Sequence, residues 1–193
     1  MPKVGMAPVR RAQLIESVIR CIDDGGLSKA TFKSVSQDAG VSAGIIAHYF
    51  GNKQGLIDAT MRHLLKNLFA DLKMAVSAFD KSSVQERLCA MVEVNFDGSQ
   101  LRKAIGRTWL SFWAESAFQR DLSRLQNVYV GRMQSLLRHE FAKVQPRPLA
   151  RDNAKLLLSA IDGEWLRTSL EGDSSDPAAI RQRISRLIAL LLN

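Results

Sequence analysis

The chain has 193 residues, 46% hydrophobic and 24% charged, a composition typical of a globular protein with one or two domains. Its two cysteines lack metal-ligand spacing, and no apolar run could span a membrane or serve as a secretory signal. These features predict a cytoplasmic protein with no metal and no cofactor. The net charge of +8 permits nucleic-acid binding but does not locate it, because residues 1–55 contribute only +3 of that total.

Apolar residues recur at helical spacing along the whole chain, which predicts an all-α fold of about nine helices. The first apolar stripe stops at Gly25-Gly26, and a long second stripe runs from Leu56 to Phe79. Ser83 and Glu86 have the spacing of a capping box that opens a third stripe. Further helices are expected over about 101–115, 122–141 and 149–170, and after Asp176-Pro177. Short helices before residue 55 and long ones after it indicate a small head on a larger helical body.

Residues 31–50 have the pattern of a helix-turn-helix. Thr31 is expected to cap a short helix, Gly40 to supply a positive φ at its end, and Ser42 to cap the second helix. An ordinary helical hairpin within a bundle shares this generic pattern. Lys53, at the start of the next long helix, favours DNA binding, because a helix N-terminus with a basic side chain is suited to hold a phosphate.

The stretch Val41–Phe50, with Asn52 and Lys53 after it, resembles the head of TetR-family transcriptional regulators. The body segments 109–114 and 161–167 resemble the choline-responsive repressors of glycine-betaine synthesis in that family. The resemblance implies a repressor, not an enzyme, that binds a pseudo-palindromic operator as a homodimer and responds to choline.

In domain terms, the resemblance implies a helix-turn-helix DNA-binding domain over 1–55, with a three-helix head, and a ligand-binding and dimerisation domain over 56–193. It also implies a set of residues that contact double-stranded DNA: Thr31, Lys33, Ser34, Ser42, Ala43, Gly44, His48, Tyr49 and Lys53. Because Ala43 and Gly44 have no side-chain hydrogen-bonding groups, His48 and Tyr49 are expected to carry more of the base readout.

Aromatic residues and acids in the body suggest an effector site. Trp109, Phe112 and Trp113 would share one helix face, and Asp162 lies one turn before Trp165 on another helix. Aromatic faces beside a carboxylate suit a quaternary ammonium such as choline. The predicted effector-binding residues are Phe96, Asp97, Trp109, Phe112, Trp113, Asp162 and Trp165.

Each of these assignments has a plain structural alternative. Aromatic residues at helical spacing commonly fill a core. Asp162 could be satisfied by Arg167 or by a backbone donor, and Glu93, Asp97 and Glu115 could simply be solvated.

Three other functions compete with this hypothesis. An enzyme is disfavoured because the sequence has no phosphate-binding loop, no zinc-protease motif and no nucleophile elbow. A protein-interaction module would not need the helix-turn-helix. A TetR-type repressor of an efflux or other operon, responding to another cationic or lipophilic ligand, stays open.

The last two long helices are predicted to form the dimer interface, because they are more apolar than the surface helices of a monomer should be. The residues expected there are Ala154, Leu157, Leu158, Ile161, Ile180, Ile184, Leu187 and Leu191, some of which must face the core of their own subunit.

Overall fold

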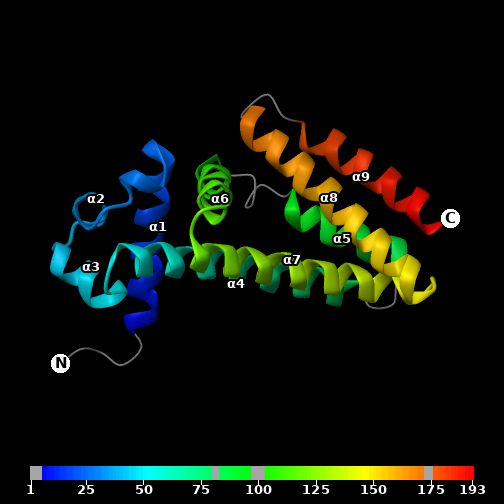
Figure 1. Ribbon diagram of the computed structural model, residues 1–193, viewed down its shortest axis with the longest axis horizontal. Helices are drawn as coiled ribbons and strands as arrows, with labels where there is room; N and C mark the ends of the chain where they lie inside the picture. Colours follow the sequence, from blue (N-terminus) through cyan, green and yellow to red (C-terminus); the bar gives the residue numbers. More distant parts are fainter. Residues whose placement is uncertain (1–5, 80–82, 97–102, 172–175) are drawn as a thin grey trace. The chain divides into compact units, whose positions relative to one another are not determined.

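The computed structural model describes residues 6–79, 83–96, 103–171 and 176–193, and within these ranges every regular element is a helix (Figure 1). The described part contains nine α-helices and a short 3₁₀ helix, which confirms the predicted all-α fold. Their bounds are α1 Met6–Gly25, η1 Leu27–Lys29, α2 Phe32–Asp38, α3 Ala43–Phe50, α4 Lys53–Ala78, α5 Val84–Asn95, α6 Lys103–Ser116, α7 Arg120–Phe141, α8 Arg147–Glu171 and α9 Pro177–Leu192.

Side-chain caps determine where several helices begin. The Thr31 hydroxyl accepts a hydrogen bond from the Ser34 backbone at 3.1 Å, while the Thr31 N–H donates to the Ser34 hydroxyl at 3.0 Å, which closes a capping box. The predicted capping box of Ser83 and Glu86 is also present at the start of α5. The Asp176 carboxylate caps α9. The predicted starts of these three helices are therefore confirmed.

The start of α8 differs from its expected position near residue 149. The helix begins at Arg147, so Pro148 lies in its first turn. Proline is tolerated there because the first N–H groups of a helix have no intrahelical acceptor.

The chain divides into two compact units, which are described separately. The first comprises the residues up to Lys66 together with Lys103–Leu125, and the second comprises Asn67–Arg102 and Gln126–Asn193. The functional division predicted at residue 55 stays a prediction. In the described part of either unit, no helix is long and apolar enough to cross a lipid bilayer.

In the first unit, α1 packs against α6 and α2. Its apolar stripe, which includes Leu14, Val18 and Ile22, is almost completely buried. Arg20 of α1 forms an ion pair with Asp38 at the end of α2, with a shortest N–O distance of 2.6 Å. These contacts hold α2 against α1.

In the second unit, α5, α8 and α9 pack together around an apolar core. The structure corrects part of the predicted dimer interface, because six of the apolar residues named for it face this core. These buried residues are Ala154, Leu157, Leu158, Ile161, Ile180 and Ile184. Leu187 and Leu191 are half-buried. Helical spacing alone could not distinguish the core face from the outer face of two helices that are apolar on both.

The second unit also contains a buried ion pair. Arg87 of α5 donates to Glu140 of α7 at 2.6 Å, and both side chains are less than 10% exposed. Lys143 also contacts Glu140 at 2.9 Å. Although burial alone would raise the pKa of Glu140, hydrogen bonds from Arg87 and Lys143 outweigh it and hold the pKa below its usual value.

Candidate DNA-binding and effector sites

The segment α2–turn–α3 has the geometry of a helix-turn-helix. Gly40 adopts a φ of 64° after α2, as the sequence predicted for a residue that ends a helix. The Val41 N–H then donates to the Ser36 carbonyl at 2.9 Å, which closes the turn. Val35 of α2 and Ile46 of α3 are completely buried, so the two helices are held by their inner faces.

The outer face of α3 exposes the residues expected to contact DNA. Ser42, Ala43, Gly44 and His48 are exposed, and Tyr49 is half-buried, with its ring edge-to-face against His48 at 5.5 Å. Ser42 occupies the N-cap position of α3, but its side chain makes no capping hydrogen bond, contrary to the predicted role. Its exposed hydroxyl is therefore not used in holding the helix.

The three predicted contacts around α2 have different environments. The hydroxyls of Thr31 and Ser34 form a hydrogen bond with each other at 2.9 Å and belong to the capping box, so both stabilise the N-terminus of α2. Lys33 is exposed. A protruding basic side chain at the first turn of α2 is suited to a phosphate contact.

The junction between α3 and α4 is tightly built. A Cβ at Gly55 would lie 2.2 Å from the Phe50 carbonyl oxygen, so only glycine fits at this position. The Asn52 side chain accepts the Gly55 N–H at 2.8 Å, as an N-cap of α4. Lys53 is exposed at the first position of α4, and its ammonium lies 3.5 Å from the Ser28 carbonyl oxygen. This arrangement places a cation at a helix N-terminus directly after α3.

The three aromatic residues predicted on α6 belong to the first unit. Trp109 and Phe112 are buried, and their rings meet edge-to-face with centroids 5.8 Å apart. Trp113 is half-buried. Trp109 and Phe112 thus contribute to packing, and the assignment of all three residues to an effector site stays a prediction.

The remaining predicted effector residues belong to the second unit, except that Asp97 lies outside the described residues. Phe96, which follows α5, is completely buried, and Trp165 of α8 is 7% exposed. Asp162 accepts a hydrogen bond from the Tyr129 hydroxyl at 2.7 Å, so its partner is neither Arg167 nor the backbone. Glu93, considered as a solvated acid, forms an ion pair with Arg181 at 3.1 Å.

The electrostatics of Asp162 are unusual for an aspartate. It has no ion pair with any described residue. Burial raises its pKa to about 6, against the opposing effect of the hydrogen bond from Tyr129. Burial and the charge of Asp162 in turn raise the pKa of Tyr129 well above its usual value. The pair therefore presents a half-buried negative charge with no countercharge from the part of the chain that the structure describes.

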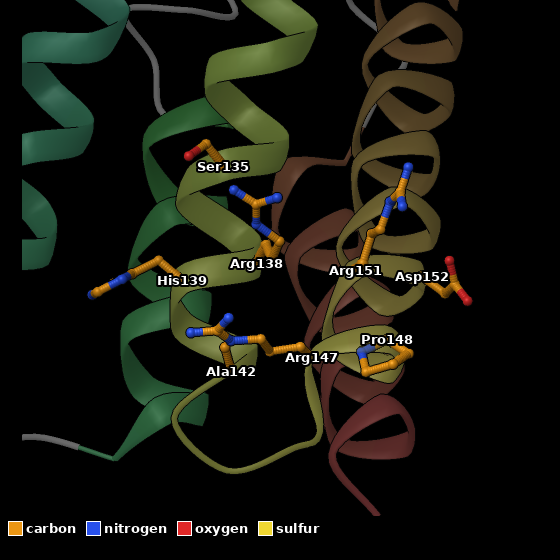
Figure 2. A pocket seen from close by; sticks show the side chains of 8 residues that line it. All are labelled: Ser135, Arg138, His139, Ala142, Arg147, Pro148, Arg151 and Asp152. Atoms are coloured by element: carbon orange, nitrogen blue, oxygen red, sulfur yellow. The ribbon is translucent and has the colours of Figure 1, made fainter.

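A concave feature of the second unit lies where α7 ends and α8 begins. It is a groove of about 710 Å³ lined by Ser135, Arg138, His139, Ala142, Arg147, Pro148, Arg151 and Asp152 (Figure 2). The only acid in this lining, Asp152, lies 3.9 Å from Lys155, and its side chain is 70% exposed. Three guanidinium groups would repel a quaternary ammonium, so the groove does not fit a cationic effector.

Two polar residues of α7 were not predicted as site residues from the sequence. Tyr129 and Gln126 lie one turn apart, and both fall within an amphipathic pattern that indicates only a helix. No local motif marks them, because the partner of Tyr129 is 33 residues away in the sequence.

Among the described residues, no cluster of three or more His, Cys, Asp or Glu side chains could hold a metal ion.

Comparison with known proteins identifies the family. Residues 14–60 match the family of bacterial regulatory proteins of the tetR type, and residues 84–193 match the C-terminal domain of BetI-type transcriptional repressors. The chain is 48% identical to the HTH-type transcriptional regulator BetI of Paraburkholderia phymatum, over the whole of this chain and 97% of that protein. It is 46% identical to the regulator of the same name from Burkholderia cenocepacia, over the whole chain and 98% of that protein.

Solved structures of transcriptional regulators share the fold. One from a Rhodococcus species superposes with a TM-score of 0.84 at 21% identity, over 94% of this chain and 95% of that one. One from Saccharomonospora viridis, in complex with choline, superposes with a TM-score of 0.80 at 19% identity, over 94% of this chain and 96% of that one. With an intact helix-turn-helix, an all-helical body and full-length relatives above 45% identity, this chain belongs to the BetI-type transcriptional repressors of the TetR family.

Proposed function

We propose that this protein is a homodimeric repressor that binds a pseudo-palindromic operator, controls the synthesis of glycine betaine from choline, and loses operator affinity when it binds choline. The observation that carries the effector assignment is the half-buried carboxylate of Asp162, which has a hydrogen-bond donor in Tyr129 and no cation among the described residues.

A quaternary ammonium supplies what this carboxylate lacks. The methylated nitrogen carries a positive charge but no N–H donor, so it is recognised by charge and by aromatic faces. Tyr129 contacts Asp162 directly, and Trp165 lies one turn from it on α8, so aromatic and acidic groups occur together. The choline complex of the Saccharomonospora viridis regulator supports choline as the effector. Phe96 and the aromatic residues of α6, Trp109, Phe112 and Trp113, remain predicted effector contacts.

The operator would be read by α3 and secured by phosphate contacts around it. His48 and Tyr49 offer polar and aromatic groups to base edges, while Ser42, Ala43 and Gly44 allow the helix start to approach the groove closely. Lys33 and Lys53 would hold phosphates on either side. Thr31 and Ser34 complete this set of proposed contacts at the N-terminus of α2.

The second copy would pack against the exposed apolar stripe of α8. Leu156, Leu166 and Leu170 are 57%, 40% and 71% exposed, which is unusual for leucines on one helix. Ser159 and Gly163 are exposed between them at helical spacing, and a Cβ at Gly163 would meet nothing within 4 Å. Small residues in the middle of such a stripe allow another helix to approach closely, as a four-helix dimer interface requires.

The effector proposal is tested by titrating choline into the purified protein bound to a labelled duplex from upstream of its own gene. Fluorescence anisotropy should show release of the DNA by choline but not by sodium chloride at equal ionic strength. Asp162→Asn should retain DNA binding and require at least tenfold more choline. If the wild-type protein binds the duplex but calorimetry detects no choline binding, the effector is another cationic or lipophilic compound.

The dimer proposal is tested by sedimentation. Leu166→Glu combined with Leu170→Glu should convert the dimer to a monomer, because charges would enter an apolar interface. Phe118→Glu, at an 88% exposed apolar residue of the first unit, is the matched control and should leave the dimer intact. A wild-type protein that sediments as a monomer at micromolar concentration would contradict the proposal.

A further inference from the structure

The side chain of Gln126, on α7, contains a buried acceptor with no partner. Its Oε1 atom is shielded from solvent and accepts no hydrogen bond from any described residue. An unsatisfied buried oxygen destabilises a folded protein, so such atoms are uncommon unless a ligand or an ordered water supplies the donor. The position of Gln126 suggests which of these it is.

Gln126 lies three residues before Tyr129 on the same helix, so the two side chains lie on the same face about one turn apart. The Tyr129 hydroxyl donates to Asp162 at 2.7 Å. In its described residues, this part of the second unit therefore combines a carboxylate that lacks a cation with an amide oxygen that lacks a donor. A ligand that complements both must carry a positive charge and, a few ångströms away, a hydrogen-bond donor.

We infer that Gln126 accepts a hydrogen bond from the hydroxyl group of the effector and thereby determines its specificity. This inference rests on the proposed choline response. Choline has a trimethylammonium group for Asp162 and, two carbon atoms away, a hydroxyl that can donate to Gln126. Glycine betaine has a carboxylate in place of the hydroxymethyl group of choline. It offers no donor, and its negative charge would meet the oxygens of both Gln126 and Asp162.

This specificity has a consequence for the control of the proposed pathway from choline to glycine betaine. The repressor would respond to the alcohol that the pathway consumes and would ignore the carboxylate that the pathway produces. Discrimination of this kind is strong when a buried polar group would be left unpaired by the wrong ligand. Gln126 is thus a specificity-determining residue, while Asp162 provides the attraction for any quaternary ammonium.

The test compares two ligands that differ in one methyl group, which replaces the hydroxyl proton and so removes the donor. Choline and its O-methyl ether, (2-methoxyethyl)trimethylammonium, are titrated by calorimetry into wild-type protein, Gln126→Met and the control Gln134→Met. Methionine keeps the length of glutamine but removes the amide oxygen. Gln134 is half-buried two turns further along the same helix. Wild type and Gln134→Met should bind choline about tenfold more tightly than the ether and should not bind glycine betaine.

In Gln126→Met, choline affinity should fall about tenfold to that of the ether, whose own affinity stays unchanged, so that the preference disappears. If wild-type protein binds choline and the ether equally, Gln126 does not read the hydroxyl, although the choline response stands. If wild-type protein binds neither ligand, both proposals fail. Equal binding of the two ligands by the wild-type protein would refute the inference even if Gln126→Met does not fold, because that comparison needs no variant.

Discussion

Replacing Asp162 by asparagine should stabilise the protein and weaken its response to choline at least tenfold. Among the residues that the structure describes, Asp162 has a single donor, Tyr129, and no cation, and its pKa is raised from 3.8 to about 6. Because a tenfold change in an acid constant corresponds to about 1.4 kcal/mol, keeping this carboxyl ionised costs the folded protein about 3 kcal/mol at neutral pH. Asparagine removes the charge and can still accept the hydrogen bond from Tyr129.

The effect should depend on pH in a defined direction. The folded-state pKa lies above the unfolded value, so between pH 3.8 and 6 the folded protein binds more protons than the unfolded chain. Wild-type stability should therefore fall as pH rises through this window and level off above it. The advantage of Asp162→Asn should be near zero at pH 4 and reach up to about 3 kcal/mol at pH 7.5.

Urea unfolding between pH 4 and 8 measures this difference directly, with Asp152→Asn as the control. Asp152 lies on the same helix, but its side chain is 70% exposed, so its replacement should change little at any pH. In parallel, choline affinity of the wild type should be constant above pH 6 and fall about tenfold per pH unit below it, because only the carboxylate attracts the cation. A less stable Asp162→Asn at pH 7.5 would refute the reasoning, since it would mean that the charge has a stabilising partner.

Three further outcomes are expected. Glu140→Gln should lower the free energy of unfolding by about 3 kcal/mol, because the buried Arg87 would lose the carboxylate that pairs with it; a loss below 1 kcal/mol in urea unfolding would contradict this. Lys53→Ala should weaken binding to all DNA sequences alike and reduce the salt slope by about 1, measured by anisotropy. Gly55→Ala should shift the end of α3, because its Cβ would collide with the Phe50 carbonyl, and anisotropy should therefore show weaker operator binding.

The elements of the fold could be predicted from the sequence because their boundaries are set locally. The capping residues Thr31 and Ser83, and the positive φ at Gly40, depend on neighbours within three or four positions. The helix-turn-helix was recognisable for the same reason. Arg87 and Glu140 are 53 residues apart, and no local pattern pairs them.

The effector region was only partly predictable. Asp162 stood out because a carboxylate within an apolar helix is costly, but its partner Tyr129 depends on how α7 packs against α8. Gln126 could not be found at all, since an unsatisfied oxygen is a property of the packed structure. The outer and inner faces of α8 could not be told apart from the sequence for a related reason, because leucines occupy both.

The exposed start of α3 also bears on how operator recognition can diverge during evolution. Ala43 and Gly44 are exposed and take no part in the core, and a Cβ at Gly44 would meet only the Ser42 hydroxyl at 3.8 Å, an ordinary contact. A larger side chain at either position would therefore cost the head little, and replacing a helical glycine typically stabilises a helix. New base contacts can accumulate there one substitution at a time, so duplicated copies of such a repressor can acquire separate operators without first losing a folded head.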